Sequence, residues 1–98
     1  MTLIPPAERK PLQAYGHVYV SGGAADRYAA ERGLAVETAR RELTDLLLTR
    51  GRVHQEDGAR LVARARSKAS GVDVTVSLLR EGEMLVVTAI LQAKDLVR

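Results

Sequence analysis

Apolar residues recur at two different spacings along this chain, and the change comes near Gly51. From residue 36 to residue 50 they follow helical spacing, which predicts one amphipathic helix with a stripe of Val36, Ala39, Leu43, Leu46 and Leu47. After Gly51 apolar and polar residues alternate, with Asp-Gly and Glu-Gly pairs in turn positions, which is typical of strands joined by tight turns. The alternation predicts strands at about 52–56, 59–66, 72–79 and 83–91.

A shorter strand and a shorter helix are predicted ahead of the amphipathic helix. Residues 17–20 are β-rich, and Ser21 follows them as a plausible helix N-cap. Residues 24–32 favour helix, and Gly33 can adopt the left-handed conformation that ends it. The expected order is therefore β-α-α-β-β-β-β. It corresponds to an α+β fold with two helices packed on one face of a mostly antiparallel sheet.

The last predicted strand is apolar on both of its faces. One face carries Met84, Val86 and Ile90, and the other carries Leu85, Val87 and Leu91. A strand of this kind is usually covered on both sides. We therefore expect it to lie in the centre of the sheet or in an interface, such as that of a homodimer.

The first fourteen residues differ from the rest of the chain. They contain all three prolines and show no periodicity that would bury a face. This predicts a flexible, proline-containing arm over residues 1–14, followed by a single α+β domain over residues 15–98.

Composition excludes several classes of function. A chain of 98 residues has the size of one domain, and it contains no cysteine and two well-separated histidines, so neither a disulfide framework nor a thiolate metal site is available. We expect no metal and no other cofactor. No apolar run reaches the length of a signal peptide or a membrane helix, which predicts a cytoplasmic protein without a membrane partner.

The basic residues suggest a class of partner. The formal net charge is +3, and twelve of the fifteen basic residues are arginines. Arginine suits bidentate contacts with phosphate, although GC-rich coding would produce the same composition. The charge therefore suits a nucleic acid or an acidic protein, without choosing between them.

The strand predicted over 59–66 carries the main candidate for binding. Alternation places Arg60, Arg64 and Arg66 on one face, where they can hold a phosphodiester backbone or a protein partner. The same pattern also describes a solvated outer face whose arginine stems cover apolar neighbours. His54, next to an acidic Asp-Gly turn, is a candidate for proton transfer.

Several short motifs carry a resemblance to a known family. They are Ala24, Arg27, Glu31-Arg32-Gly33-Leu34, Ala39, Asp57-Gly58 and Val86-Val87-Thr88. With the predicted order of elements, residues 17–91 resemble the RelE-type and BrnT-type toxin-like superfamily and its small phage and prophage relatives. The resemblance implies a basic cleft and, in active members, cleavage of RNA.

The resemblance also bears on individual residues. It makes Arg27 and Arg32 candidates for charge stabilisation in catalysis. Similar sequences often carry a His immediately before the Ala of the first helix, and this chain has Gly23 there. An obvious acid/base group is therefore missing.

Two functions remain open at this stage. The first is a small toxin-like RNA-binding protein, either an endoribonuclease or its inactive descendant. The second is a phage or mobile-element protein that binds and inhibits a host protein complex, for example one used in defence. The expected partner is accordingly RNA, or else a host or antitoxin protein.

Overall fold

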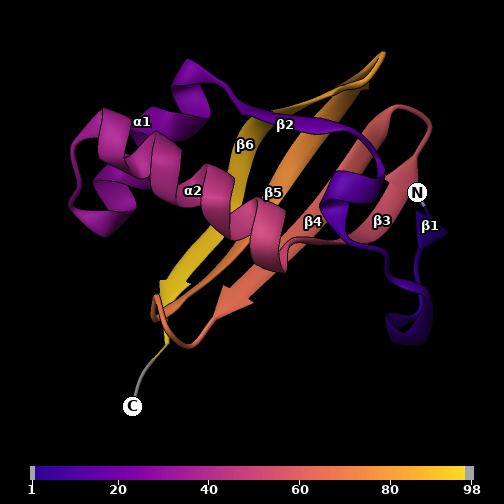
Figure 1. Ribbon diagram of the computed structural model, residues 1–98, viewed down its shortest axis with the longest axis horizontal. Coiled ribbons are helices and arrows are strands. Elements are labelled where there is room, and N and C mark those ends of the chain that lie inside the picture. The colour runs from indigo at the N-terminus through magenta and orange to yellow at the C-terminus, as the bar shows by residue number, and fades with distance from the viewer. Residues whose placement is uncertain (1, 97–98) are drawn as a thin grey trace.

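Six strands form one sheet, and two helices cover one of its faces (Figure 1). The computed structural model describes residues 2–96. The strands are β1 (Thr2–Leu3), β2 (His17–Val20), β3 (Arg52–Asp57), β4 (Arg60–Ser67), β5 (Val72–Glu81) and β6 (Met84–Asp95). Their order in the sheet is β1-β3-β4-β5-β6-β2, and all neighbours are antiparallel except β2 and β6, which are parallel. The predicted α+β fold is confirmed.

Both helices end where their capping residues allow. Helix α1 (Gly22–Arg32) begins after Ser21, whose Oγ accepts a hydrogen bond from the Ala24 N–H at 3.3 Å. It ends at Gly33, which is left-handed at φ 67°. Helix α2 (Val36–Arg50) has the bounds predicted from its apolar spacing.

Neither of these helices is long and apolar enough to cross a membrane, nor is any other helix among the described residues.

Aliphatic side chains fill the space between the helices and the sheet. Helix α2 buries Ala39, Leu43, Leu46 and Leu47, while Val36 at its first turn is exposed. Helix α1 adds Tyr28, which has no exposed surface. The strands supply alternate residues such as Val74, Val76 and Leu78 of β5, so the opposite face of the sheet carries the polar positions.

Strand β6 differs from its prediction on one point. It does have a neighbour on each side, but only one of its faces is covered, because Met84 and Leu91 are 40% and 55% exposed. The pairing with β5 contains two register shifts, which change the phase of the alternation. Leu85, Val87 and Ile90 therefore share the buried face although their spacing is not regular.

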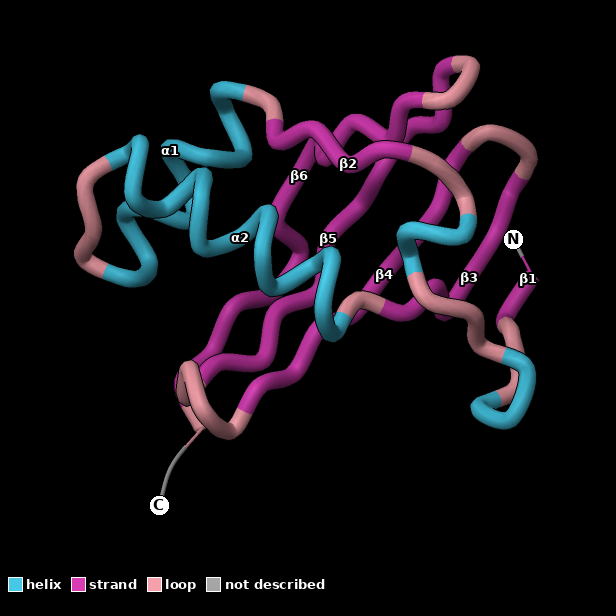
Figure 2. The backbone as a smooth tube through the Cα atoms, viewed as in Figure 1, coloured by secondary structure: helices cyan, strands magenta, loops and turns pink. Residues whose placement is uncertain are grey.

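Residues 2–14 pack on the domain instead of extending from it as an arm (Figure 2). Strand β1 pairs with β3, and two short 3-10 helices follow, η1 (Pro6–Glu8) and η2 (Leu12–Ala14). Leu12 is completely buried in the core. Leu12 is a single apolar residue, and one residue cannot form a periodic pattern. The sequence around it therefore does not predict its burial. The domain therefore begins before the predicted boundary at residue 15.

We predict that Val87→Asp destabilises the domain by about 3 kcal/mol or more, because it buries a carboxylate without a partner. Val87 has no exposed surface. The matched variant on the same strand is Leu91→Asp, which should cost less than about 1 kcal/mol. Urea denaturation measures both. Equal stability of the two variants would show that β6 does not bury residue 87.

A second prediction concerns the N-terminal segment. Leu12→Ala should lower the free energy of unfolding by about 2–5 kcal/mol, as expected for a leucine removed from a packed core. Leu3→Ala is the control, since Leu3 is 63% exposed, and it should change stability by about 0.5 kcal/mol or less. If Leu12→Ala is as harmless as the control, residues 1–14 are an arm after all.

Candidate functional site

The arginines of β4 alternate as the sequence predicts. Leu61, Ala63 and Ala65 are buried beneath the helices, whereas Arg60, Arg64 and Arg66 are exposed. Their positions along the strand differ, however. Arg60 pairs with Asp57 of β3 and Leu79 of β5 at one end, while Arg64 pairs with Arg52 at the other end, where β3 begins. Arg64 and Arg66 are therefore brought together, and Arg60 lies apart from them.

An open cleft of about 470 Å³ lies where α2 ends and β3 begins. No Asp or Glu is found among the described residues that line it. We call it the basic cleft, and its cationic and imidazole side chains are Arg9, Arg50, Arg52, His54, Arg64 and Arg66. Five guanidinium groups and one imidazole thus face one space.

The N-terminal segment and the α2–β3 junction build this cleft together. The Leu12 N–H donates to the Gly51 carbonyl at 2.9 Å, and the Val53 N–H donates to the Lys10 carbonyl at 3.1 Å. A Cβ at Gly51 would lie 2.3 Å from the Leu47 carbonyl oxygen, so only glycine fits this tight exit from the helix. These contacts bring Arg9 alongside residues that follow it by more than forty positions.

Backbone carbonyls hold two of the arginines in place. Arg9 Nε donates to the Ile4 carbonyl at 2.9 Å, and Arg52 Nη1 donates to the Arg9 carbonyl at 2.9 Å. Within residues 2–96, the side chains of Arg50 and Arg66 make no hydrogen bond or ion pair. The cleft therefore combines tethered guanidinium groups with unengaged ones.

Asp73 compensates part of this charge from the neighbouring strand. Its carboxylate accepts a hydrogen bond from Arg64 Nε at 2.9 Å and a second from Arg64 Nη2, and only 4% of the residue is exposed. The hydrogen bond from Arg64 lowers the pKa of Asp73, and the positive charges of Lys94 and Arg66 act in the same direction. Asp73 therefore stays ionised and orients the Arg64 guanidinium.

His54, the candidate for proton transfer, lies in the basic cleft. Burial lowers the pKa of His54, and the charges of Arg9 and Arg64 lower it further, against a smaller opposite effect of Asp73. Its imidazole is therefore uncharged at neutral pH and can accept a proton. Gly23, where similar sequences carry a His, does not line the cleft.

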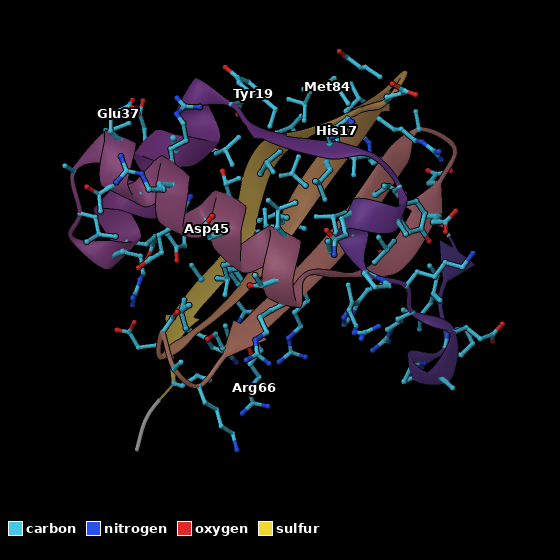
Figure 3. All side chains as sticks on the ribbon, viewed as in Figure 1. His17, Tyr19, Glu37, Asp45, Arg66 and Met84 are labelled. Carbon is cyan, nitrogen blue, oxygen red and sulfur yellow. The ribbon has the colours of Figure 1, made fainter. Side chains whose placement is uncertain are left out.

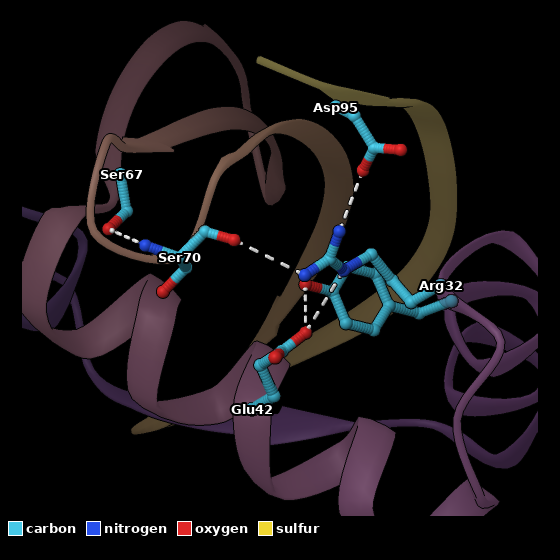
Figure 4. A network of polar contacts seen from close by, with 6 residues as sticks. Arg32, Glu42, Ser67, Ser70 and Asp95 are labelled. Carbon is cyan, nitrogen blue, oxygen red and sulfur yellow. Dashed lines mark hydrogen bonds and ion pairs between the residues drawn. The ribbon is translucent and has the colours of Figure 1, made fainter. Parts of the chain in front are cut away.

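The other two arginine candidates lie on α1 and have structural partners. Arg27 pairs with Glu31 one turn later, at 3.0 Å. Arg32 binds Asp95 Oδ1 at 2.7 Å, Glu42 Oε2 at 3.3 Å and the Ser70 carbonyl at 3.3 Å (Figure 4). Neither lines the basic cleft.

The Arg32 contacts belong to a network that joins distant parts of the chain. The hydroxyl of buried Tyr28 donates a hydrogen bond to the same Glu42 oxygen at 2.7 Å. Burial is the main cause that raises the pKa of Tyr28, and this hydrogen bond raises it further. The network connects α1, α2, the β4–β5 turn and the end of β6 (Figure 4). Arg32 therefore has a stabilising role here.

Sequence reasoning missed three arginines of the cleft. Arg9 lies in the segment predicted as an arm, and Arg50 is the last residue of the predicted amphipathic helix. Arg52 was only the first residue of a predicted strand. The available signal was Arg50-Gly51-Arg52 at a junction of helix and strand, which places two guanidinium groups beside a tight turn.

Comparisons with protein-family models, with curated proteins and with solved structures find no match for this chain.

We predict that Asp73→Asn lowers the free energy of unfolding by about 1–3 kcal/mol at pH 7, because Arg64 loses its charged partner. A carboxylate whose folded pKa is lowered stabilises the fold above its unfolded pKa of about 3.9, and this stabilisation is lost as the pH falls through the folded pKa. The stability difference between wild type and variant should therefore shrink below about pH 4.

Asp57→Asn is the matched control, since Asp57 is exposed and forms no ion pair within the described residues. Its effect on the free energy of unfolding should be small. A constant difference between wild type and Asp73→Asn from pH 7 to pH 3 would mean that the Asp73 charge does not support the fold.

Proposed function

We propose that this chain is a small basic RNA-binding protein that holds RNA phosphates in the basic cleft. The observation that carries the proposal is the lining of that cleft. The described residues that line it contribute five guanidinium groups and one imidazole, and none of them is Asp or Glu. Arg64 does face a carboxylate, but Asp73 engages only part of its guanidinium.

The chemistry of the guanidinium group supports a phosphodiester ligand. Arginine binds phosphate oxygens through paired, charge-assisted hydrogen bonds, and binding releases counterions from the nucleic acid. Arg9 and Arg52 are held by backbone carbonyls through one nitrogen each, which leaves their other N–H groups for a ligand. Such pre-organisation reduces the conformational entropy lost on binding.

The resemblance of residues 17–91 to the RelE-type and BrnT-type toxin-like superfamily supports RNA as the polyanion. We propose binding without cleavage as the function. His54 is the only imidazole among the described residues of the cleft, and Gly23, where similar sequences often carry a His, lies outside it. A chain of this kind corresponds to an inactive descendant of a ribonuclease, and incubation with labelled RNA tests directly whether it cuts.

An exposed face at the β2–β6 end of the sheet, away from the arginines of β4, favours a second candidate function, binding and inhibition of a host protein complex. Tyr19 of β2 and Met84 of β6 are 51% and 40% exposed on neighbouring strands. They lie on the opposite side of the molecule from Arg66 (Figure 3). A protein partner bound through this face should therefore be insensitive to changes in the basic cleft.

We predict that changing Arg50 and Arg66 together to Gln weakens RNA binding and flattens the plot of log affinity against log salt. Loss of two phosphate contacts should reduce the slope by about 1.4, at about 0.7 per contact for a single strand. Fluorescence anisotropy with a labelled oligoribonucleotide, repeated at several salt concentrations, measures the slope. Both arginines are exposed, so the fold should be unaffected.

The matched control is Arg41→Gln with Arg60→Gln. These two arginines are also exposed, and they lie outside the basic cleft. Their substitution removes the same total charge as the substitution of Arg50 and Arg66. The control should retain the wild-type slope. Equal loss in both double variants would indicate diffuse attraction to a basic surface, and no binding by the wild type at low salt would end the RNA proposal.

A further inference from the structure

A second cleft adjoins the basic cleft. It has a volume of about 560 Å³, and both clefts are lined by Gln13 of η2 and Leu48 of α2. Its other lining residues include Tyr15 and Arg80, and we call it the Tyr15 cleft. The described lining residues of the basic cleft include no Tyr, Phe or Trp, so the two clefts offer different chemistry along one continuous surface.

We propose that the Tyr15 cleft binds an unpaired nucleobase of the same RNA strand whose phosphates lie in the basic cleft. The inference rests on the proposed function and makes it more specific. It assigns single-stranded RNA as the ligand, because the bases of a duplex are stacked on each other and unavailable to the cleft. It also assigns the cleft a role as a base-stacking subsite.

Two planar groups supply the stacking surface. The Arg80 guanidinium carbon lies 5.9 Å from the centre of the Tyr15 ring, and both side chains line the cleft. Bases stack on aromatic rings and on arginine planes, with little dependence on which base is present. Tyr15 and Arg80 together provide such a surface.

The Tyr15 ring is held in a fixed orientation. Its hydroxyl donates to Glu56 Oε1 at 2.7 Å. Burial, together with this hydrogen bond, raises the pKa of Tyr15 to about 12, so the phenol is uncharged at neutral pH. A neutral, anchored ring gives a base an apolar surface without repelling the neighbouring phosphates.

Polar groups at the rim of the cleft can pair with the edge of a base. Gln13 and Glu83 are exposed and line the cleft, and they offer amide donors, an amide acceptor and a carboxylate acceptor. The position of Glu83 is fixed by the backbone, since its carbonyl accepts from the His17 N–H at 2.8 Å. A Cβ at Gly16 would lie 2.5 Å from that carbonyl oxygen, so glycine permits this close approach.

Binding of two ligands by two Tyr15 variants tests the inference. The ligands are hexauridylate and an abasic hexamer with the same ribose-phosphate backbone. Tyr15→Leu should weaken binding of hexauridylate about tenfold, the loss expected when one base loses its stacking partner. It should leave binding of the abasic hexamer unchanged. Tyr15→Phe keeps the ring without the hydroxyl and should retain most of the affinity for hexauridylate.

The abasic hexamer separates a local effect from a loss of fold. If Tyr15→Leu binds both hexamers like the wild type, or if the wild type binds both equally well, the Tyr15 cleft does not hold a base and the inference fails while the proposed function stands. If the wild type binds neither hexamer, the proposed function itself fails.

The unmodified protein gives a test that does not depend on any variant. A single-stranded oligoribonucleotide should bind more tightly than a duplex of equal length at the same salt concentration. Equal or tighter binding of the duplex would overturn the assignment, because a duplex presents phosphates without an unpaired base.

Discussion

The tight junction at Gly51 is the constraint on which the rest of the structure depends. Helix α2 passes into β3 without a loop, and the Gly51 N–H still donates to the Leu47 carbonyl at 2.9 Å. The Gly51 carbonyl accepts from the Leu12 N–H, which ties the N-terminal segment to the same point. Arg50 and Arg52 flank the junction, so one backbone arrangement concentrates positive charge from both elements.

Concentrated positive charge is unfavourable unless something compensates it. Asp73, almost completely buried, holds Arg64, while backbone carbonyls hold Arg9 and Arg52. Like charges brought together without full compensation attract an anion, and a phosphodiester backbone supplies several negative charges at once. The Tyr15 cleft lies next to these guanidinium groups. It adds a surface on which a base of the same strand can stack.

From residue 17 onward, the order of helices and strands was predictable because it follows local rules. Periodicity indicates α2, Ser21 and Gly33 cap α1, and alternation indicates that Arg60, Arg64 and Arg66 share a face. Alternation does not indicate where along a strand a cleft lies. For this reason Arg60 was grouped with two residues from which it lies apart.

The features that the sequence did not predict arise from long-range contacts. Leu12 is buried by elements that follow it far along the chain, and the phase of β6 changes at two register shifts in its pairing with β5. Arg9 reaches the cleft only because its segment bonds to the α2–β3 junction. No local pattern of residues carries this information.

Nuclear magnetic resonance of the isotopically labelled protein titrated with hexauridylate tests the central claim most directly. The account predicts that signals of Arg9, Arg50, Arg52, His54 and Arg66 shift together with those of Tyr15 and Arg80, while those of Tyr19 and Leu91 stay unchanged. Shifts confined to the β2–β6 end of the sheet, around Tyr19 and Met84, or no shifts at low salt, would contradict it.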